Sequence, residues 1–209
     1  MLDYEERINE YNKITNPDEL LSFMDKYITY GIYGTDNKIY TNWEMDTNSE
    51  FQLAYQSNYE LCDCDRLLKY GYGTCWDQVE LERTWFTTHG YENKTFFIWF
   101  YFNKENNYIT HTYLIYKDKN MNKYYYFENS DINNRGIKEF ASYKDAIEYQ
   151  KSKHIEFNKK NGNKIDEEVL KHLQIYEFRI NKYKCNQEEY INNILNSKLI
   201  YENNIYKNI

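Results

Sequence analysis

Three consecutive segments between residues 96 and 128 have the patterns of β-strands and constrain the fold more than any other part of the chain. Phe96 to Phe102 is a continuous apolar run, which is typical of a strand buried on both faces. The side chains of Ile109 to Tyr116 alternate between the two faces of a second strand. Tyr124 to Glu128 forms a third strand, which a polar turn joins to the second. We therefore expect an antiparallel sheet at the centre of the protein.

Helical patterns lie on both sides of these strands. We expect helices over about residues 3–14, from Asn16-Pro17 onward, and over about 75–86, 142–160, 166–172 and 187–197. A further strand is expected over Ile175 to Tyr183, and residues 30–50 are expected to be irregular or extended. Helices before and after an antiparallel sheet predict an α+β fold, and no Pro/Gly/Ser-rich linker divides the chain, so residues 1–209 are expected to form one domain.

Cys75 stands at the predicted start of a helix, in the sequence GYGTCWD that begins at Gly71. The two glycines favour a turn, and Thr74 is suited to the N-cap position. A thiol in the first helical turn lies at the positive end of the backbone dipoles, which favours the nucleophilic thiolate. A buried cysteine with a purely structural role is the alternative interpretation of Cys75 alone.

A histidine and a carboxylate follow on the second and third strands. His111 lies near the start of the second strand, and Glu128 lies at the end of the third. In a hairpin these two positions are at the same level, so we expect His111 and Glu128 to be neighbours within reach of one hydrogen bond. Cys75, His111 and Glu128 together predict a nucleophile, a general base and a group that orients the base.

These residues resemble the transglutaminase-like superfamily, whose members have a papain-like cysteine-enzyme fold. The resemblance covers about residues 52–140 and rests on the Gly-x-Cys-Trp helix start, the His-Thr-aromatic strand and the aromatic strand that ends in an acid. The CWDQVELER segment, which begins at Cys75, is similar to a small bacterial branch of that superfamily. The resemblance implies a catalytic core with the nucleophile at the start of a helix packed on an antiparallel sheet.

The third member of the set departs from the family pattern. The usual residue is Asp, or Asn in papain-like relatives, whereas this chain has Glu128, followed by Asn129 and later by Asp131. We choose Glu128 because it continues the strand, while Asn129 would point to the other face. The side chain that assists the Cys75 amide in binding an oxyanion is left open among Gln52, Gln56, Trp43 and Trp76.

Other charged and sulfur-containing residues receive weaker interpretations. Cys62-Asp63-Cys64-Asp65 lacks a second Cys/His pair at zinc-finger spacing, so no metal site and no cofactor are expected. Asp77 and Glu80 lie in the predicted Cys75 helix; we interpret them as solvated helix charges, and the alternative is that they hold the helix start or a loop. Arg135-Gly136-Ile137 is interpreted as a turn that stabilises the acidic end of the third strand.

Composition limits the range of partners and compartments. The net charge is −7, and residues 1–66 hold 14 acidic and 5 basic residues, so a nucleic acid is an unexpected partner. No run of about 18 apolar residues is present, and the acidic N-terminus is unlike a signal peptide. Four cysteines do not form a disulfide framework, so a reducing cytoplasm is expected; the oligomeric state is not predicted.

These observations lead to three functional hypotheses. The first is a cysteine hydrolase that cleaves an amide or peptide bond through a thioester. The second is an acyltransferase, either a transglutaminase or a toxin that modifies one host protein. The third is a binding domain that keeps the fold but catalyses no reaction. The presence of all three residues Cys75, His111 and Glu128 argues against this hypothesis.

Overall fold

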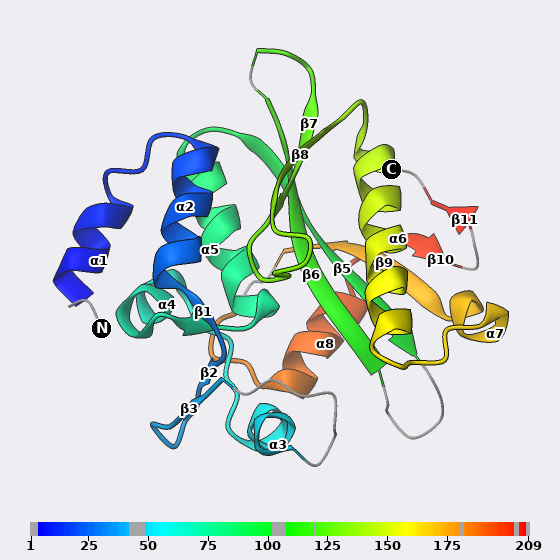
Figure 1. Ribbon diagram of the computed structural model, residues 1–209, viewed down its shortest axis with the longest axis horizontal. Coiled ribbons are helices and arrows are strands. Elements are labelled where there is room, and N and C mark those ends of the chain that lie inside the picture. The colour runs from blue at the N-terminus through cyan, green and yellow to red at the C-terminus, as the bar shows by residue number, and fades with distance from the viewer. Residues whose placement is uncertain are drawn as a thin grey trace.

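The computed structural model describes residues 4–41, 49–101, 108–118, 120–179, 182–202 and 205–207. In these residues the chain forms eight helices and three β-sheets, the largest of which is antiparallel (Figure 1). The helices are α1 Tyr4–Tyr11, α2 Pro17–Tyr27, α3 Glu50–Ser57, α4 Cys64–Tyr70, α5 Cys75–Thr88, α6 Tyr143–Lys160, α7 Glu167–Lys171 and α8 Gln187–Leu195. The strands are β1 Thr29–Tyr30, β2 Ile32–Tyr33, β3 Ile39–Tyr40, β4 Tyr72–Gly73, β5 Glu92–Tyr101, β6 Tyr108–Lys117, β7 Tyr124–Glu128, β8 Gly136–Phe140, β9 Leu173–Phe178, β10 Lys198–Glu202 and β11 Ile205–Tyr206.

The main sheet has seven strands in the order β11-β10-β9-β5-β6-β7-β8. β5 and β6 pair along their whole length, from Glu92 opposite Lys117 to Tyr101 opposite Tyr108. The β6–β7 ladder is much shorter, because it begins only at Leu114, which pairs with Phe127. The first half of β6, which includes His111, therefore has no ladder pairing with β7.

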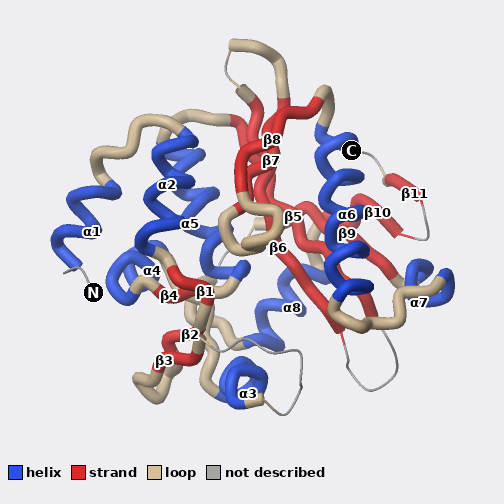
Figure 2. Tube along the Cα trace, viewed as in Figure 1, coloured by secondary structure: helices blue, strands red, loops and turns tan. Residues whose placement is uncertain are grey.

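Helices cover both faces of this sheet. α5 and the N-terminal helices lie on one side, and α6 lies on the other (Figures 1 and 2). Because strand side chains alternate, Phe97 and Leu114 pack in the core on the α5 side, whereas Ile98 and Tyr113 pack with Ile147 of α6. The expected α+β architecture with an antiparallel sheet is confirmed.

Several element boundaries differ from those expected. The strand predicted over Ile175 to Tyr183 spans Leu173–Phe178, because its ladder with β5 ends at Phe178 and its ladder with β10 ends at Glu177. The turn predicted at Arg135-Gly136-Ile137 is wrong beyond Arg135, since Gly136 begins the edge strand β8. β8 is only partly buried on both faces, so its sequence lacks the alternation that marks a strand.

Six of the eight helices that the structure describes were expected, whereas α3 and α4 were not. α2 begins at Pro17 and its N-cap is Asn16, whose side chain accepts a hydrogen bond from the Glu19 amide at 3.0 Å. α6 matches its expected range, while α1 ends at Tyr11, before the expected boundary. Among the described residues, no helix combines the length and the apolar character needed to cross a bilayer.

Candidate active site at the start of helix α5

The chain turns sharply before α5, which places Cys75 at the first helical position. Gly71 caps α4 with a φ of 73°, a left-handed conformation that glycine adopts without steric cost. Gly73 has no room for a side chain, because an added Cβ would lie 2.6 Å from Leu67 Cδ1 and 2.9 Å from Asp77 Cβ. Thr74 is the N-cap residue, as expected.

Asp77 holds this turn from inside the protein. Its Oδ2 atom accepts hydrogen bonds from the Thr74 amide at 2.7 Å and the Thr74 hydroxyl at 2.9 Å. Its Oδ1 atom accepts from the Cys62 amide at 2.8 Å and the Tyr59 hydroxyl at 3.0 Å. Burial raises the pKa of Asp77, and these four bonds act in the opposite direction. Asp77 therefore fixes the start of α5, where Cys75 lies.

The interpretation of Asp77 and Glu80 as solvated charges is wrong. Asp77 is 2% exposed and Glu80 is fully buried. Glu80 forms an ion pair with Arg83 and accepts a hydrogen bond from the Tyr183 hydroxyl at 3.3 Å. The side of α5 that turns away from the sheet is thus covered by other parts of the chain, which the local sequence pattern does not reveal.

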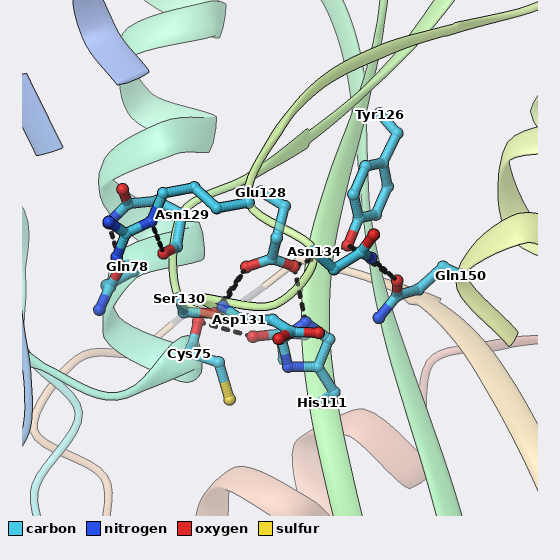
Figure 3. A network of polar contacts seen from close by, with 12 residues as sticks. Cys75, Gln78, His111, Tyr126, Glu128, Asn129, Ser130, Asp131, Asn134 and Gln150 are labelled. Carbon is cyan, nitrogen blue, oxygen red and sulfur yellow. Dashed lines mark hydrogen bonds and ion pairs between the residues drawn. The ribbon is translucent and has the colours of Figure 1, made fainter. Parts of the chain in front are cut away.

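β6 carries the two residues that meet the start of α5. The Thr112 hydroxyl, on the α5 face of the sheet, donates a hydrogen bond to the Cys75 carbonyl at 2.6 Å. His111 is the adjacent residue, so its ring starts on the opposite face, at a level where β6 has no partner in β7. Figure 3 shows one nitrogen of this ring turned towards Cys75 and the other towards Glu128.

Glu128 is the group that holds His111. The His111 Nε2 atom lies 2.7 Å from Glu128 Oε2, which also accepts a hydrogen bond from the Tyr126 hydroxyl at 2.8 Å. The other carboxylate oxygen accepts from the Ser130 hydroxyl at 2.8 Å and from the Asp131 amide at 2.9 Å. The contact expected between His111 and Glu128 is therefore present. Asp131 donates its backbone amide to Glu128, and its carboxyl group also interacts electrostatically with His111.

Charge and burial shift the pKa values of His111 and Glu128 in opposite directions. Burial alone would lower the pKa of His111, but the Glu128 carboxylate and hydrogen bonds with Cys75 and Glu128 raise it well above its ordinary value. Burial would likewise raise the pKa of Glu128, but the His111 charge and the bonds from His111, Asp131 and Ser130 lower it. The geometry thus favours an imidazolium beside a carboxylate.

Asn129 points to the α5 side of the sheet, as expected. Its side-chain amide donates to the Gln78 carbonyl oxygen at 2.8 Å, and the Gln78 amide donates to the Gly73 carbonyl at 2.9 Å. Arg135 donates to the Asn129 carbonyl at 2.9 Å and forms an ion pair with Asp25 of α2. The loop after β7 is therefore tied both to the turn before Cys75 and to the N-terminal helices.

The expected oxyanion donors have different surroundings. Trp43 lies outside the described residues, and Gln56 is exposed on α3. Trp76 is fully buried, stacks on Tyr190 with a ring distance of 4.1 Å, and its indole nitrogen has no hydrogen-bond partner among the described residues. Gln52 lies half-buried on α3.

Tyr30, Glu82 and His154 lie around the site and were not predicted. The Tyr30 hydroxyl interacts with the Cys75 thiol, and Glu82 is a buried carboxyl two helical turns after Cys75. His154 of α6 stacks near His111 with a ring distance of 6.0 Å. No local motif marks any of them: Tyr30 is one of 25 tyrosines and stands in a two-residue strand.

The cysteine-aspartate segment before α4 has structural contacts. Asp63 is the N-cap of α4 and accepts from the Arg66 amide at 2.8 Å, while the Cys64 thiol donates to the Glu80 carbonyl at 3.7 Å. Within the described ranges, no three His, Cys, Asp or Glu side chains are grouped so that they could hold a metal ion.

Comparisons of the chain with protein-family models, curated proteins and solved structures found no match.

Proposed function

We propose that this protein is a cysteine-dependent hydrolase that cleaves an amide or peptide bond through a thioester. The observation that supports this most is the series of contacts from Cys75 through the His111 ring to Glu128, in which the last pair is 2.7 Å apart. A thiol, an imidazole and an orienting carboxylate in this order are the groups that nucleophilic acyl transfer requires. The transglutaminase-like resemblance of the same three residues agrees with this proposal.

The geometry supports a balanced sequence of steps. With His111 held as an imidazolium, the proton of Cys75 already lies on Nδ1, and the thiolate sulfur forms a bond to the substrate carbonyl carbon, whose π electrons move to the oxygen. The oxygen electrons return, the carbon–nitrogen bond breaks, and His111 protonates the departing amine. Water, deprotonated by His111, attacks the thioester; the acid leaves, and the Cys75 thiolate beside the imidazolium is restored. Glu128 remains ionised and stabilises the imidazolium in each step.

Reducing surroundings suit this chemistry. All four cysteines, including Cys75, are free thiols. Oxidation of a nucleophilic thiol would stop turnover, so we propose that the protein acts in a reducing cytoplasm on a peptide or protein substrate.

The first experiment measures acylation of Cys75 by an activated ester, p-nitrophenyl acetate, with intact-mass detection of the thioester. We expect one acetyl group on the wild type and none on Cys75→Ala, whose melting temperature should stay close to that of the wild type. Cys185→Ala is the matched control, because Cys185 is also a buried free thiol, and it should acylate normally. An acetyl group that persists in Cys75→Ala would place the nucleophile elsewhere.

The second experiment compares the four thiols at about pH 6 with limiting iodoacetamide. Burial raises the pKa of Cys62 and Cys64, and burial raises that of Cys185 to about 11, so these three stay protonated and react slowly. Cys75 should therefore be alkylated first. Equal labelling of all four cysteines, or labelling of Cys75 only in denaturant, would contradict its role.

Substrate screening then separates hydrolysis from acyl transfer. Peptide substrates are tested with and without a labelled primary amine, and turnover without the amine is the expected result. Incorporation of the amine into a glutamine-containing peptide, with no hydrolysis in its absence, would favour an acyltransferase. Turnover should survive treatment with a chelator, whereas loss on chelation and recovery with zinc would contradict a metal-free mechanism.

A further inference from the structure

The strand β1 fixes Tyr30 beside the turn that leads to Cys75. β1 and β4 pair in parallel, with Tyr30 opposite Gly73. Two backbone bonds hold this register: the Thr29 amide donates to the Gly71 carbonyl at 2.8 Å, and the Gly31 amide donates to the Gly73 carbonyl at 3.3 Å. Tyr30 is thus placed by the same short segment, residues 71–73, that places Cys75.

The ring and hydroxyl of Tyr30 have separate surroundings. The ring stacks on Phe51 of α3 with a centroid distance of 6.2 Å and an interplanar angle of 18°. Burial raises the pKa of Tyr30 well above its ordinary value, and Cys75 adds to the rise through its charge and by accepting a hydrogen bond. The phenol therefore keeps its proton and remains a hydrogen-bond donor at the sulfur.

We propose that Tyr30 is a catalytic residue that donates a hydrogen bond to the oxyanion formed when Cys75 attacks a carbonyl group. This inference rests on the proposed function of Cys75 as a nucleophile. When the sulfur–carbon bond forms, the carbonyl π electrons move to the oxygen, which then lies one atom away from the sulfur. A donor already held at the sulfur needs only a small shift to reach that oxygen, and its proton stays on the phenol.

The other donor is the Cys75 backbone amide, at the exposed end of the α5 backbone dipoles. Tyr30 also fits better than two of the donors considered from the sequence, Trp76 and Gln56. Trp76 stacks in the core and Gln56 is exposed, whereas Tyr30 interacts with the reacting thiol itself. The Tyr30 side chain is half-buried, so part of it is exposed to solvent.

The test compares two reagents on the full-length Tyr30→Phe protein. Acylation by p-nitrophenyl acetate passes through an oxyanion, whereas alkylation by iodoacetamide is a direct displacement that forms none. Tyr30→Phe keeps the ring on Phe51 and should slow acylation about 100-fold, the usual loss for one oxyanion donor, while alkylation changes less than about threefold. Tyr27→Phe is the matched control, since Tyr27 is a half-buried phenol of α2 that packs on Phe23, and both rates should stay at the wild-type level.

Each other outcome has a definite meaning. Equal slowing of both reactions in Tyr30→Phe would show that the phenol acts on the thiolate, and unchanged rates would show that it has no role; either result overturns the inference. A melting temperature close to that of the wild type shows that the variant has kept its structure. Failure of the wild-type protein to acylate at Cys75 would instead refute the proposed function, and the inference with it.

Discussion

Replacement of Glu128 by glutamine should disable His111 without changing the size of the side chain. The two carboxylate oxygens accept four hydrogen bonds, from His111 and Tyr126 on one side and from Ser130 and Asp131 on the other. A glutamine has only one acceptor oxygen, so its amide group must face one of these pairs of donors. If it faces His111, Nε2 must become the acceptor, and the proton moves to Nδ1, which then cannot take a proton from Cys75.

The expected losses of rate and of stability in Glu128→Gln follow from the loss of this tautomer and of the ion pair. The wrong tautomer should lower the rate of Cys75 acylation by about 10³- to 10⁴-fold. Removing one partner of a buried ion pair costs about 3–5 kcal/mol, and glutamine retains some of the hydrogen bonds, so we expect a loss of about 3 kcal/mol in the free energy of unfolding.

The pH dependence of this loss has a defined sign. The lowered pKa of Glu128 contributes stability above about pH 4.3, which disappears as the pH falls through its folded-state pKa. The raised pKa of His111 contributes stability below about pH 6.5, which disappears as the pH rises through its folded-state pKa. The difference in the free energy of unfolding between the wild type and Glu128→Gln should therefore be largest between about pH 4.3 and 6.5. It should become smaller at lower and at higher pH.

Urea unfolding at pH 3, 5.5 and 9, together with the acylation rate, measures both effects. Ser130→Ala is the matched control, because it removes one donor to Glu128 and leaves the charge and the His111 contact in place. It should cost about 1 kcal/mol and less than tenfold in rate. If Glu128→Gln resembles Ser130→Ala in rate and in stability, Glu128 does not hold His111 in its working tautomer.

Two further predictions concern the buried titratable groups around the site. The stability of Glu82→Gln should be nearest to that of the wild type at about pH 3.5 and should exceed it at pH 8. Burial and the Glu128 charge raise the pKa of Glu82 well above its ordinary value, so the wild type loses stability as the pH rises above about 4.3; equal urea midpoints at pH 8 would contradict this. His154 should stay neutral from pH 5 to 8, because burial and the His111 charge lower its pKa to about 3. An NMR resonance assigned to His154 that titrates near pH 6 would refute this prediction.

The central strands could be predicted because their sequence patterns follow directly from burial. Continuous apolar residues mark β5, which is covered on both faces. β6 is also buried on both faces from His111 to Tyr116, and its side chains alternate between these faces. The contact of His111 with Glu128 follows from the same periodicity, since both side chains must leave the sheet on one face. The periodicity does not give the register of β6 against β7. Leu114 pairs with Phe127, so Glu128 lies diagonal to His111 and not directly opposite it.

The parts that were missed depend on contacts between distant segments. Tyr30 reaches Cys75 through a parallel pairing of two-residue strands, which has no sequence signature of its own. Asp77 and Glu80 have ordinary helical spacing, and their burial depends on Tyr59 and Tyr183, which lie in other segments. Polarity within one helix therefore could not show which of its charged residues are enclosed.

The short β6–β7 ladder explains how a cysteine on one side of the sheet can meet a histidine that leaves it on the other. α5 contacts the face that carries Thr112, whereas His111 and Glu128 leave the sheet on the α6 face. A ladder that continued past Leu114 would place β7 alongside His111, in the position where Cys75 now approaches. The chain instead leaves the sheet after Glu128, and bonds from Asn129 to Gln78 and from Arg135 to the Asn129 carbonyl hold it there. The loop that ends β7 is thus as necessary to the site as the three side chains, because it opens the edge of β6 through which they meet.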